Sequence, residues 1–320
     1  MASIYLNGEW IAPAEAKVSV MDRGFLFGDG VYEIIPVYSR MPFRLDEHLA
    51  RLQYSLDGVA LLNPHSLAEW RVLILKLATD SQWEDQSIYI QVTRGPMAVR
   101  NHAFPAVIKP TVMLMAEPLT TPPTSMIENG IATVSAIDTR WLRCDLKTTS
   151  LLANCLLRQH AVALGCVETI LFRDGLLTEG SASSIFVIKA GVLFAPPKDH
   201  RILPGITYDI VLELASTHGL PVFVRDITEA ETRNADELWL ASSTKEILPI
   251  ATLDGKDIGV NLPVGADVQC PLSTADPLRR RKAVLCETPA SPPSGDSRWP
   301  IHTKMLAWYQ TYKHEVMRHG

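Results

Sequence analysis

A single lysine interrupts an apolar run in the stretch Asp145-Leu146-Lys147-Thr148-Thr149-Ser150-Leu151-Leu152. Residues 141–146 before it read as extended, and the apolar spacing after it predicts a helix over residues 150–160, with Thr148 or Thr149 as its cap. A lysine fixed and partly desolvated at such a junction has a nucleophilic amine that can form a Schiff base with an aldehyde. A surface lysine before a helix would have the same local sequence, so features elsewhere in the chain decide between the two interpretations.

The composition is that of an ordinary globular protein. The chain has 320 residues, of which 47% are hydrophobic and 20% are charged, so one or two domains with ample core are expected. A net charge of −5 implies no general attraction to nucleic acid or to an anionic membrane. Five cysteines without a Cys-x-x-Cys pair argue against a disulfide framework or a zinc site, so we expect no metal and a cytoplasmic location. The N-terminus does not resemble a signal peptide, and no window approaches the length of a membrane-spanning helix.

The first part of the chain reads as strands with two helices. Asn7-Gly8 predicts a hairpin turn, and leucines at helical spacing predict an amphipathic helix over residues 44–56, with Arg51 off the leucine stripe. A second helix is predicted over residues 67–79. Strands are predicted over residues 31–38, 88–93 and 111–116.

Prolines and threonines near residue 120 predict a stiff connector over residues 118–126. This connector would separate a small N-terminal α/β domain, residues 1–117, from a larger domain, residues 127–320. Strands and helices are mixed without strict alternation beyond it, so an α+β fold is favoured over a doubly wound sheet. The proline-rich stretch 262–298, with its basic run at residues 279–282, reads as an irregular and solvated insertion, and a final amphipathic helix is predicted over residues 303–317.

Two further stretches fit the same kind of cofactor as Lys147. Glu179 is a lone acid in a small-residue segment, which we place in a turn between strands, and a carboxylate there can keep a pyridine nitrogen protonated. Pro204-Gly205-Ile206-Thr207 opens a predicted helix over residues 206–218, whose free N–H groups suit a phosphate. Additional phosphate donors are the hydroxyls of Ser243 and Thr244 and the guanidinium of Arg51. The alternatives are that Glu179 is a solvated glutamate in a turn and that Gly205 and Thr207 merely cap a helix.

A separate group of residues is suited to a substrate carboxylate. Arg100 and His102 lie two apart in an extended loop, so both side chains can point the same way. An exposed basic loop is the alternative. Tyr32 follows the glycine turn at residues 28–30 and can donate to the same carboxylate. These glycines do not form the Gly-x-Gly-x-x-Gly fingerprint of a dinucleotide site.

Several of these stretches together resemble the class IV (fold type IV) pyridoxal-phosphate-dependent aminotransferases, most closely the D-amino-acid aminotransferases. They run in family order over about residues 3–260, and the final helix also matches. The matching stretches are Asp22-Arg23-Gly24-Phe25-Leu26-Phe27-Gly28-Asp29-Gly30-Val31-Tyr32-Glu33, Glu47-His48-Leu49-Ala50-Arg51-Leu52, Gln91-Val92-Thr93-Arg94-Gly95, Arg100-x-His102, Cys144-Asp145-Leu146-Lys147, Thr178-Glu179-Gly180, Ile202-Leu203-Pro204-Gly205-Ile206-Thr207 and Ser242-Ser243-Thr244-Lys245-Glu246.

The resemblance implies a fold, a cofactor and roles for particular residues. The fold would have a larger C-terminal domain with a barrel-like sheet and would hold pyridoxal 5'-phosphate at the domain interface. Lys147 would be the catalytic Schiff-base lysine, and Glu179 would pair with the pyridine nitrogen. The implied phosphate ligands are Arg51, Ile206, Thr207 and Thr244, with Ser243 as a further donor. The implied carboxylate trap is Tyr32, Arg100 and His102, the last two reaching across from the second subunit of a homodimer.

The implied activity is transfer of an amino group from a D-amino acid such as D-alanine to a 2-oxo acid such as 2-oxoglutarate. The sequence departs from the family at Ser184, where asparagine is usual, and in the insertion at residues 262–298. The alternatives within the family are a branched-chain L-amino-acid aminotransferase, an aminodeoxychorismate lyase and an R-selective amine transaminase. The non-enzymatic alternative is an inactive relative that binds the cofactor.

Overall fold

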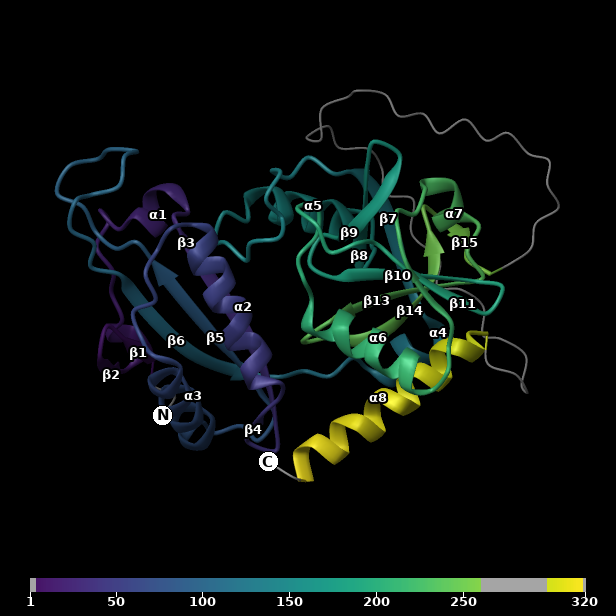
Figure 1. Cartoon of the computed structure of the whole chain (residues 1–320), viewed down its shortest axis with the longest axis horizontal. Coiled ribbons are helices and arrows are strands. Elements are labelled where there is room, and N and C mark those ends of the chain that lie inside the picture. The colour runs from purple at the N-terminus through teal and green to yellow at the C-terminus, as the bar shows by residue number, and fades with distance from the viewer. Residues whose placement is uncertain (1–3, 260–297, 319–320) are drawn as a thin grey trace.

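The structure is a computed structural model that describes residues 4–259 and 298–318. Two β-sheets dominate it, with helices packed on both, which confirms the predicted α+β class. Figure 1 shows the N-terminal sheet, in purple and blue, beside the larger C-terminal sheet, in teal and green. Within the described residues, every helix is too short or too polar to cross a lipid bilayer.

The N-terminal sheet has six strands in the order β2-β1-β6-β5-β3-β4, and all its pairings are antiparallel. The strands are β1 (Ile4–Leu6), β2 (Glu9–Ile11), β3 (Gly30–Tyr38), β4 (Met41–Pro42), β5 (Gln86–Thr93) and β6 (Thr111–Pro118). The helices of this half are η1 (Pro13–Glu15), α1 (Arg23–Phe27), α2 (Leu45–Gly58) and α3 (Leu67–Asp80). The predicted hairpin at Asn7-Gly8 is confirmed.

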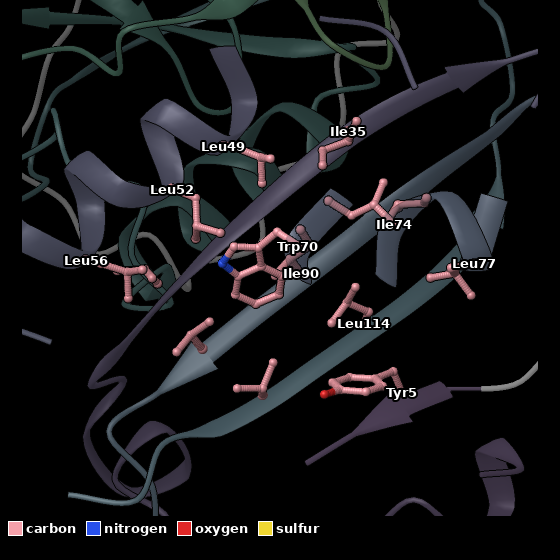
Figure 2. Packing of buried hydrophobic residues seen from close by; sticks show 14 of the residues in the cluster. Tyr5, Ile35, Leu49, Leu52, Leu56, Trp70, Ile74, Leu77, Ile90 and Leu114 are labelled. Atoms are coloured by element: carbon pink, nitrogen blue, oxygen red, sulfur yellow. The ribbon is translucent and has the colours of Figure 1, made fainter. Parts of the chain in front are cut away.

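The core of this half lies between its sheet and the helices α2 and α3. Leucines of the predicted stripe on α2, among them Leu49, Leu52 and Leu56, pack on strand residues such as Ile35 and Ile90, as Figure 2 shows. Trp70 and Ile74 of α3 complete the same cluster. The spacing of apolar residues therefore fixes which faces of the two helices are buried.

The C-terminal sheet has nine strands in the order β12-β11-β10-β13-β14-β7-β8-β9, and β15 also pairs with β14. The strands are β7 (Ile131–Ile137), β8 (Glu168–Arg173), β9 (Leu176–Gly180), β10 (Ser184–Lys189), β11 (Val192–Ala195), β12 (Val222–Val224), β13 (Glu237–Ser242), β14 (Glu246–Leu253) and β15 (Lys256–Asp257). The helices are α4 (Thr124–Asn129), α5 (Leu152–Ala163), α6 (Ile206–Thr217), α7 (Glu229–Arg233) and α8 (Pro300–Arg318).

This sheet is mostly buried on both faces. One cluster packs α6 and α8 against β10 and β13, and a second cluster covers the opposite face with residues of α4. Figure 1 shows α8, in yellow, alongside α6. The uninterrupted apolar runs of β8 and β10 reflect this two-sided burial.

The segment that carries Lys147 joins the two halves. Its main chain pairs with the start of β3, because the Tyr32 N–H donates to the Lys147 carbonyl at 2.9 Å and the Thr149 N–H donates to the Gly30 carbonyl at 3.0 Å. An isolated bridge links Val31 and Thr148 between these bonds. Lys147 is therefore anchored by backbone hydrogen bonds to the opposite half of the molecule.

Several local predictions are wrong. The helix after Lys147 begins at Leu152, and its cap residue, Leu151, makes no side-chain cap bond. Thr149 does not cap it, because its hydroxyl donates to the Gly28 and Gly30 carbonyls at 2.9 and 3.2 Å. These bonds to the glycine turn are tertiary, so the local sequence did not show them.

Four short helices, η1, α1, α4 and α7, occupy segments for which no helix was predicted. Helix α1 lies in the glycine-rich segment, where the Asp22 side chain accepts from the Gly24 N–H at 2.8 Å and Gly28 ends the helix with a φ of 67°. Helix α4 begins inside the predicted connector. Glu179 lies at the end of strand β9 and not in a turn.

The division into domains at residues 118–126 stays a prediction. The insertion at residues 262–298 and its basic run lie outside the described residues, except for Arg298.

Candidate active site

A cavity of about 530 Å³ lies where residues of both halves meet. Tyr32 and Arg51 come from the N-terminal half, and Lys147 and Glu179 come from the C-terminal half. The start of α6 and the turn between β13 and β14 complete the wall with Ile206, Thr207, Ser243 and Thr244. The cavity thus collects every residue predicted to bind the cofactor, although Arg100 and His102 do not line it.

The Lys147 amine faces an aromatic ring. Its Nζ atom lies 4.3 Å from the centroid of the Tyr32 ring. Tyr32 follows Val31 on β3, and Val31 is the residue that bridges to Thr148. The Lys147 N–H donates to the Ser55 hydroxyl of α2 at 3.1 Å. Contacts from β3 and α2 therefore fix the lysine backbone, and the amine reaches into the cavity.

Glu179 is a buried carboxylate with two donors. The Arg140 guanidinium donates to Oε1, and the Leu203 N–H donates to Oε2 at 3.1 Å. Burial raises the pKa of Glu179 above its usual range, although Arg140 and the Leu203 N–H act against this rise. Asp138 in turn accepts from Arg140 Nε at 2.9 Å and Nη2 at 2.8 Å. No sequence pattern indicated Arg140 or Asp138 as members of this site.

Arg51 is held by a second buried carboxylate. Its Nη1 donates to the Pro204 carbonyl at 2.9 Å, two residues before α6, while Glu33 accepts from the rest of the guanidinium. Burial alone would raise the pKa of Glu33, but Arg51 and His48 hold it well below its usual range. The guanidinium is thereby oriented at the start of α6.

The start of α6 offers donors for an anion. Its cap residue, Gly205, makes no side-chain cap bond, so the first N–H groups of this 12-residue helix have no such acceptor. A Cβ atom at Gly205 would lie only 2.9 Å from the Ser184 hydroxyl, so a larger residue here would require the Ser184 side chain to move. Thr207, Ser243 and Thr244 add hydroxyls to the same cavity. Backbone amides, hydroxyls and a guanidinium are the donors that phosphate prefers.

The loop at residues 181–184 rests on a buried glutamate that the sequence analysis missed. Glu168 accepts from the Ser181 hydroxyl, from the Ser181 N–H at 3.1 Å and from the Ser183 hydroxyl at 3.0 Å. Lys245 lies 3.5 Å from the same carboxylate and follows the turn that carries Thr244. Glu168 therefore links two loops of the cavity wall, although it does not itself line the cavity.

Arg100 and His102 lie together, but on the surface. The Arg100 guanidinium lies 5.0 Å from the centroid of the Phe27 ring, and the His102 ring lies 5.1 Å from it. Arg23 fixes the loop by donating to the Asn101 carbonyl at 2.6 Å and to the His102 carbonyl at 3.0 Å. Both side chains therefore lie near the Phe27 ring, and both are exposed.

The chain matches the family model for class IV amino-transferases over residues 30–253. A D-alanine aminotransferase from Bacillus licheniformis is 39% identical to it over 260 residues, which cover 81% of this chain and 91% of that protein. A D-alanine aminotransferase from Staphylococcus aureus (strain MW2) is 40% identical over 259 residues, with the same two coverages, 81% and 91%.

Solved structures show the same architecture. The branched-chain amino acid aminotransferase of Escherichia coli superposes with a TM-score of 0.74 at 27% identity, covering 80% of this chain and 88% of that one. A fold IV transaminase from Curtobacterium pusillum has a TM-score of 0.71 at 25% identity, covering 82% and 95%. The predicted fold type IV is thereby confirmed, and the chain belongs to the class IV aminotransferases.

Proposed function

We propose that this protein is a D-amino-acid transaminase that moves the amino group of a donor such as D-alanine to a 2-oxo acid such as 2-oxoglutarate. The relatives of 39% and 40% identity are D-alanine aminotransferases, and each match covers 91% of the relative. The observation that carries the proposal is the convergence of Lys147, Glu179 and the start of α6 on one cavity.

The donor set fits pyridoxal 5'-phosphate, the cofactor of this family. The cavity holds one amine, one buried carboxylate and a cluster of phosphate donors. When bound, the cofactor supplies an aldehyde that condenses with amines and a ring that takes up the electron pair left at the substrate Cα. A related branched-chain aminotransferase, with a TM-score of 0.74 and 25% identity, was solved with pyridoxamine 5'-phosphate.

Each residue then has a separate task. The Lys147 amine would bind the cofactor through its aldehyde and, once the substrate amine had taken its place, would carry the proton that leaves the substrate Cα. The Glu179 carboxylate would keep a proton on the pyridine nitrogen of the cofactor. Arg51, Ile206, Thr207, Ser243 and Thr244 bind the phosphate.

The substrate α-carboxylate is assigned to Tyr32 of the same chain and to Arg100 and His102 of a second copy in a homodimer. Two observations support a trap completed by another chain: both residues are exposed, and the buried Arg23 side chain holds the main chain of their loop with hydrogen bonds. An enzyme whose site needs two subunits would be an obligate dimer. We also propose a cytoplasmic location.

A branched-chain L-amino-acid aminotransferase is the second candidate, because solved enzymes of that activity superpose with TM-scores up to 0.74. The two activities place the α-carboxylate on opposite sides of the cofactor. The stereochemistry of the donor therefore separates them.

The decisive experiment is a spectral half-reaction. Purified, cofactor-loaded protein is mixed with D-alanine and, separately, with L-leucine, and the visible absorption band of the cofactor is followed. Loss of the band with D-alanine alone is expected. Loss with L-leucine alone would move the protein to the branched-chain group, and no loss with either donor would point to the lyase, the amine transaminase or an inactive relative.

A further inference from the structure

Four cationic side chains line the cavity, and three of them already have a partner or a task. Arg51 is paired with Glu33, and Arg140 is paired with Asp138 and Glu179. Lys147 provides the reactive amine. The fourth, Arg158 of α5, lines the cavity without an ion pair to any carboxylate in the described part of the chain.

The position of Arg158 is fixed by the helix that carries it. One turn earlier on α5, the Asn154 side chain donates to the Ser181 carbonyl at 2.8 Å, which docks this face of the helix on the loop at residues 181–184. Residues four apart share a helix face, so Arg158 lies on the same side. Its only hydrogen bond to the described residues is a long one, from Nη1 to the Cys166 carbonyl at 3.5 Å.

A guanidinium in this position is suited to an anion that arrives with the substrate. Arg158 is partly buried, so it keeps some hydration and does not need a permanent carboxylate partner. The wall of the same cavity is partly apolar, with Trp141, Leu146 and Leu151 among the lining residues, and such a surface accommodates a short hydrocarbon chain. Planar guanidinium groups bind carboxylates with two parallel hydrogen bonds.

We propose that Arg158 recognises the second, distal carboxylate of a dicarboxylic substrate, such as D-glutamate or 2-oxoglutarate. The inference rests on the proposed function, in which the α-carboxylate already has Tyr32 and the partner's loop as donors. Arg158 is thus a specificity-determining residue for acidic side chains and is not needed for the chemistry at Cα.

The test compares monocarboxylic and dicarboxylic substrates in the holoenzyme. Kinetic constants for the half-reactions are measured with D-alanine and D-glutamate, and with pyruvate and 2-oxoglutarate. In Arg158→Met, kcat/KM for the dicarboxylates is expected to fall by about 10- to 100-fold, mostly through KM, while values for D-alanine and pyruvate change less than about threefold. Arg158→Lys keeps the charge and should restore part of the loss.

Arg225→Met is the matched control, because Arg225 lines a separate cavity and pairs with Glu231. It should leave all four constants unchanged. An equal loss for all substrates in Arg158→Met would overturn the inference, since Arg158 would then bind the α-carboxylate or support the fold. No loss for any substrate would overturn it as well. Failure of the wild-type protein to convert D-alanine would instead refute the proposed function.

Discussion

Glu33 binds the Arg51 guanidinium with both of its carboxylate oxygens, at 2.9 Å from Nε and 2.6 Å from Nη2. Both side chains are buried, and the His48 ring lies 3.1 Å from the same carboxylate. Strand β3 thereby orients a side chain of helix α2 toward the start of α6. The orientation matters because a bidentate pair fixes the plane of the guanidinium as well as its place.

The variant Glu33→Gln is therefore expected to weaken cofactor binding. It removes the charge that compensates the buried Arg51, and breaking such a buried pair costs about 3–5 kcal/mol of stability. A mispositioned Arg51 should raise the dissociation constant for pyridoxal 5'-phosphate by at least about tenfold. Equilibrium dialysis of the phosphate cofactor measures this change, and pyridoxal without the phosphate serves as the comparison ligand.

Glu47→Gln is the control on the same helix, because Glu47 is more exposed and pairs with Arg44 outside the cavity. It should bind the cofactor as the wild type does. Unchanged cofactor affinity in Glu33→Gln would show that Glu33 does not organise the phosphate site.

The sequence could predict the fold because apolar spacing and turn residues mark most of its elements. It could also indicate Lys147 and Glu179, since lone charged residues in apolar or small-residue segments stand out. Glu33, Arg140 and Glu168, which hold site residues or the cavity loops, were not predicted. Their burial depends on contacts between segments distant in the chain, and such contacts leave no local pattern. The same reason explains Thr149, whose hydroxyl bonds the glycine turn instead of capping α5.

The ion pair of Arg140 and Glu179 predicts that replacing Arg140 changes the pH dependence of kcat. Burial raises the pKa of Glu179, and Arg140 opposes that rise. In Arg140→Met the carboxyl loses this opposing charge, so its pKa rises further and a smaller fraction is ionised near neutral pH. The acid limb of the kcat profile is therefore expected to move to higher pH, and Arg140→Lys should move it back toward the wild type. An acid limb that stays in place or moves to lower pH in Arg140→Met would contradict the role assigned to this pair.

The packing in the core of the N-terminal half predicts how much stability is lost when a buried side chain is shortened. Leu52 is fully buried between α2 and the sheet, among the residues drawn in Figure 2. Leu52→Ala is expected to lower the free energy of unfolding by about 2–5 kcal/mol. The exposed Leu62 provides the matched control, and Leu62→Ala should change the stability by less than about 0.5 kcal/mol. Urea unfolding of both variants measures the difference, and similar values for the two would refute the assigned packing.

His302 of α8 predicts a loss of stability in acid. Its ring is buried, with Nε2 3.1 Å from the Ile247 carbonyl, and burial lowers its pKa from 6.5 to about 4. Between these two values the unfolded chain binds the proton more readily than the folded chain does. The contribution of the neutral ring to stability is therefore complete above about pH 6.5, and it is lost as the pH falls toward about 4.

The lowered pKa of His302 corresponds to a loss of about 3 kcal/mol in the free energy of unfolding once the pH has fallen to about 4. In His302→Gln no proton competes for the buried site, so the stability of the variant should fall less steeply between about pH 6.5 and pH 4. Urea unfolding at several pH values compares the two slopes, and His314→Gln, an exposed change on the same helix, should follow the wild type. Parallel curves for the wild type and His302→Gln would mean that His302 is not the group whose protonation destabilises the fold, because every other titrating group, including the nearby Glu237, is common to both proteins.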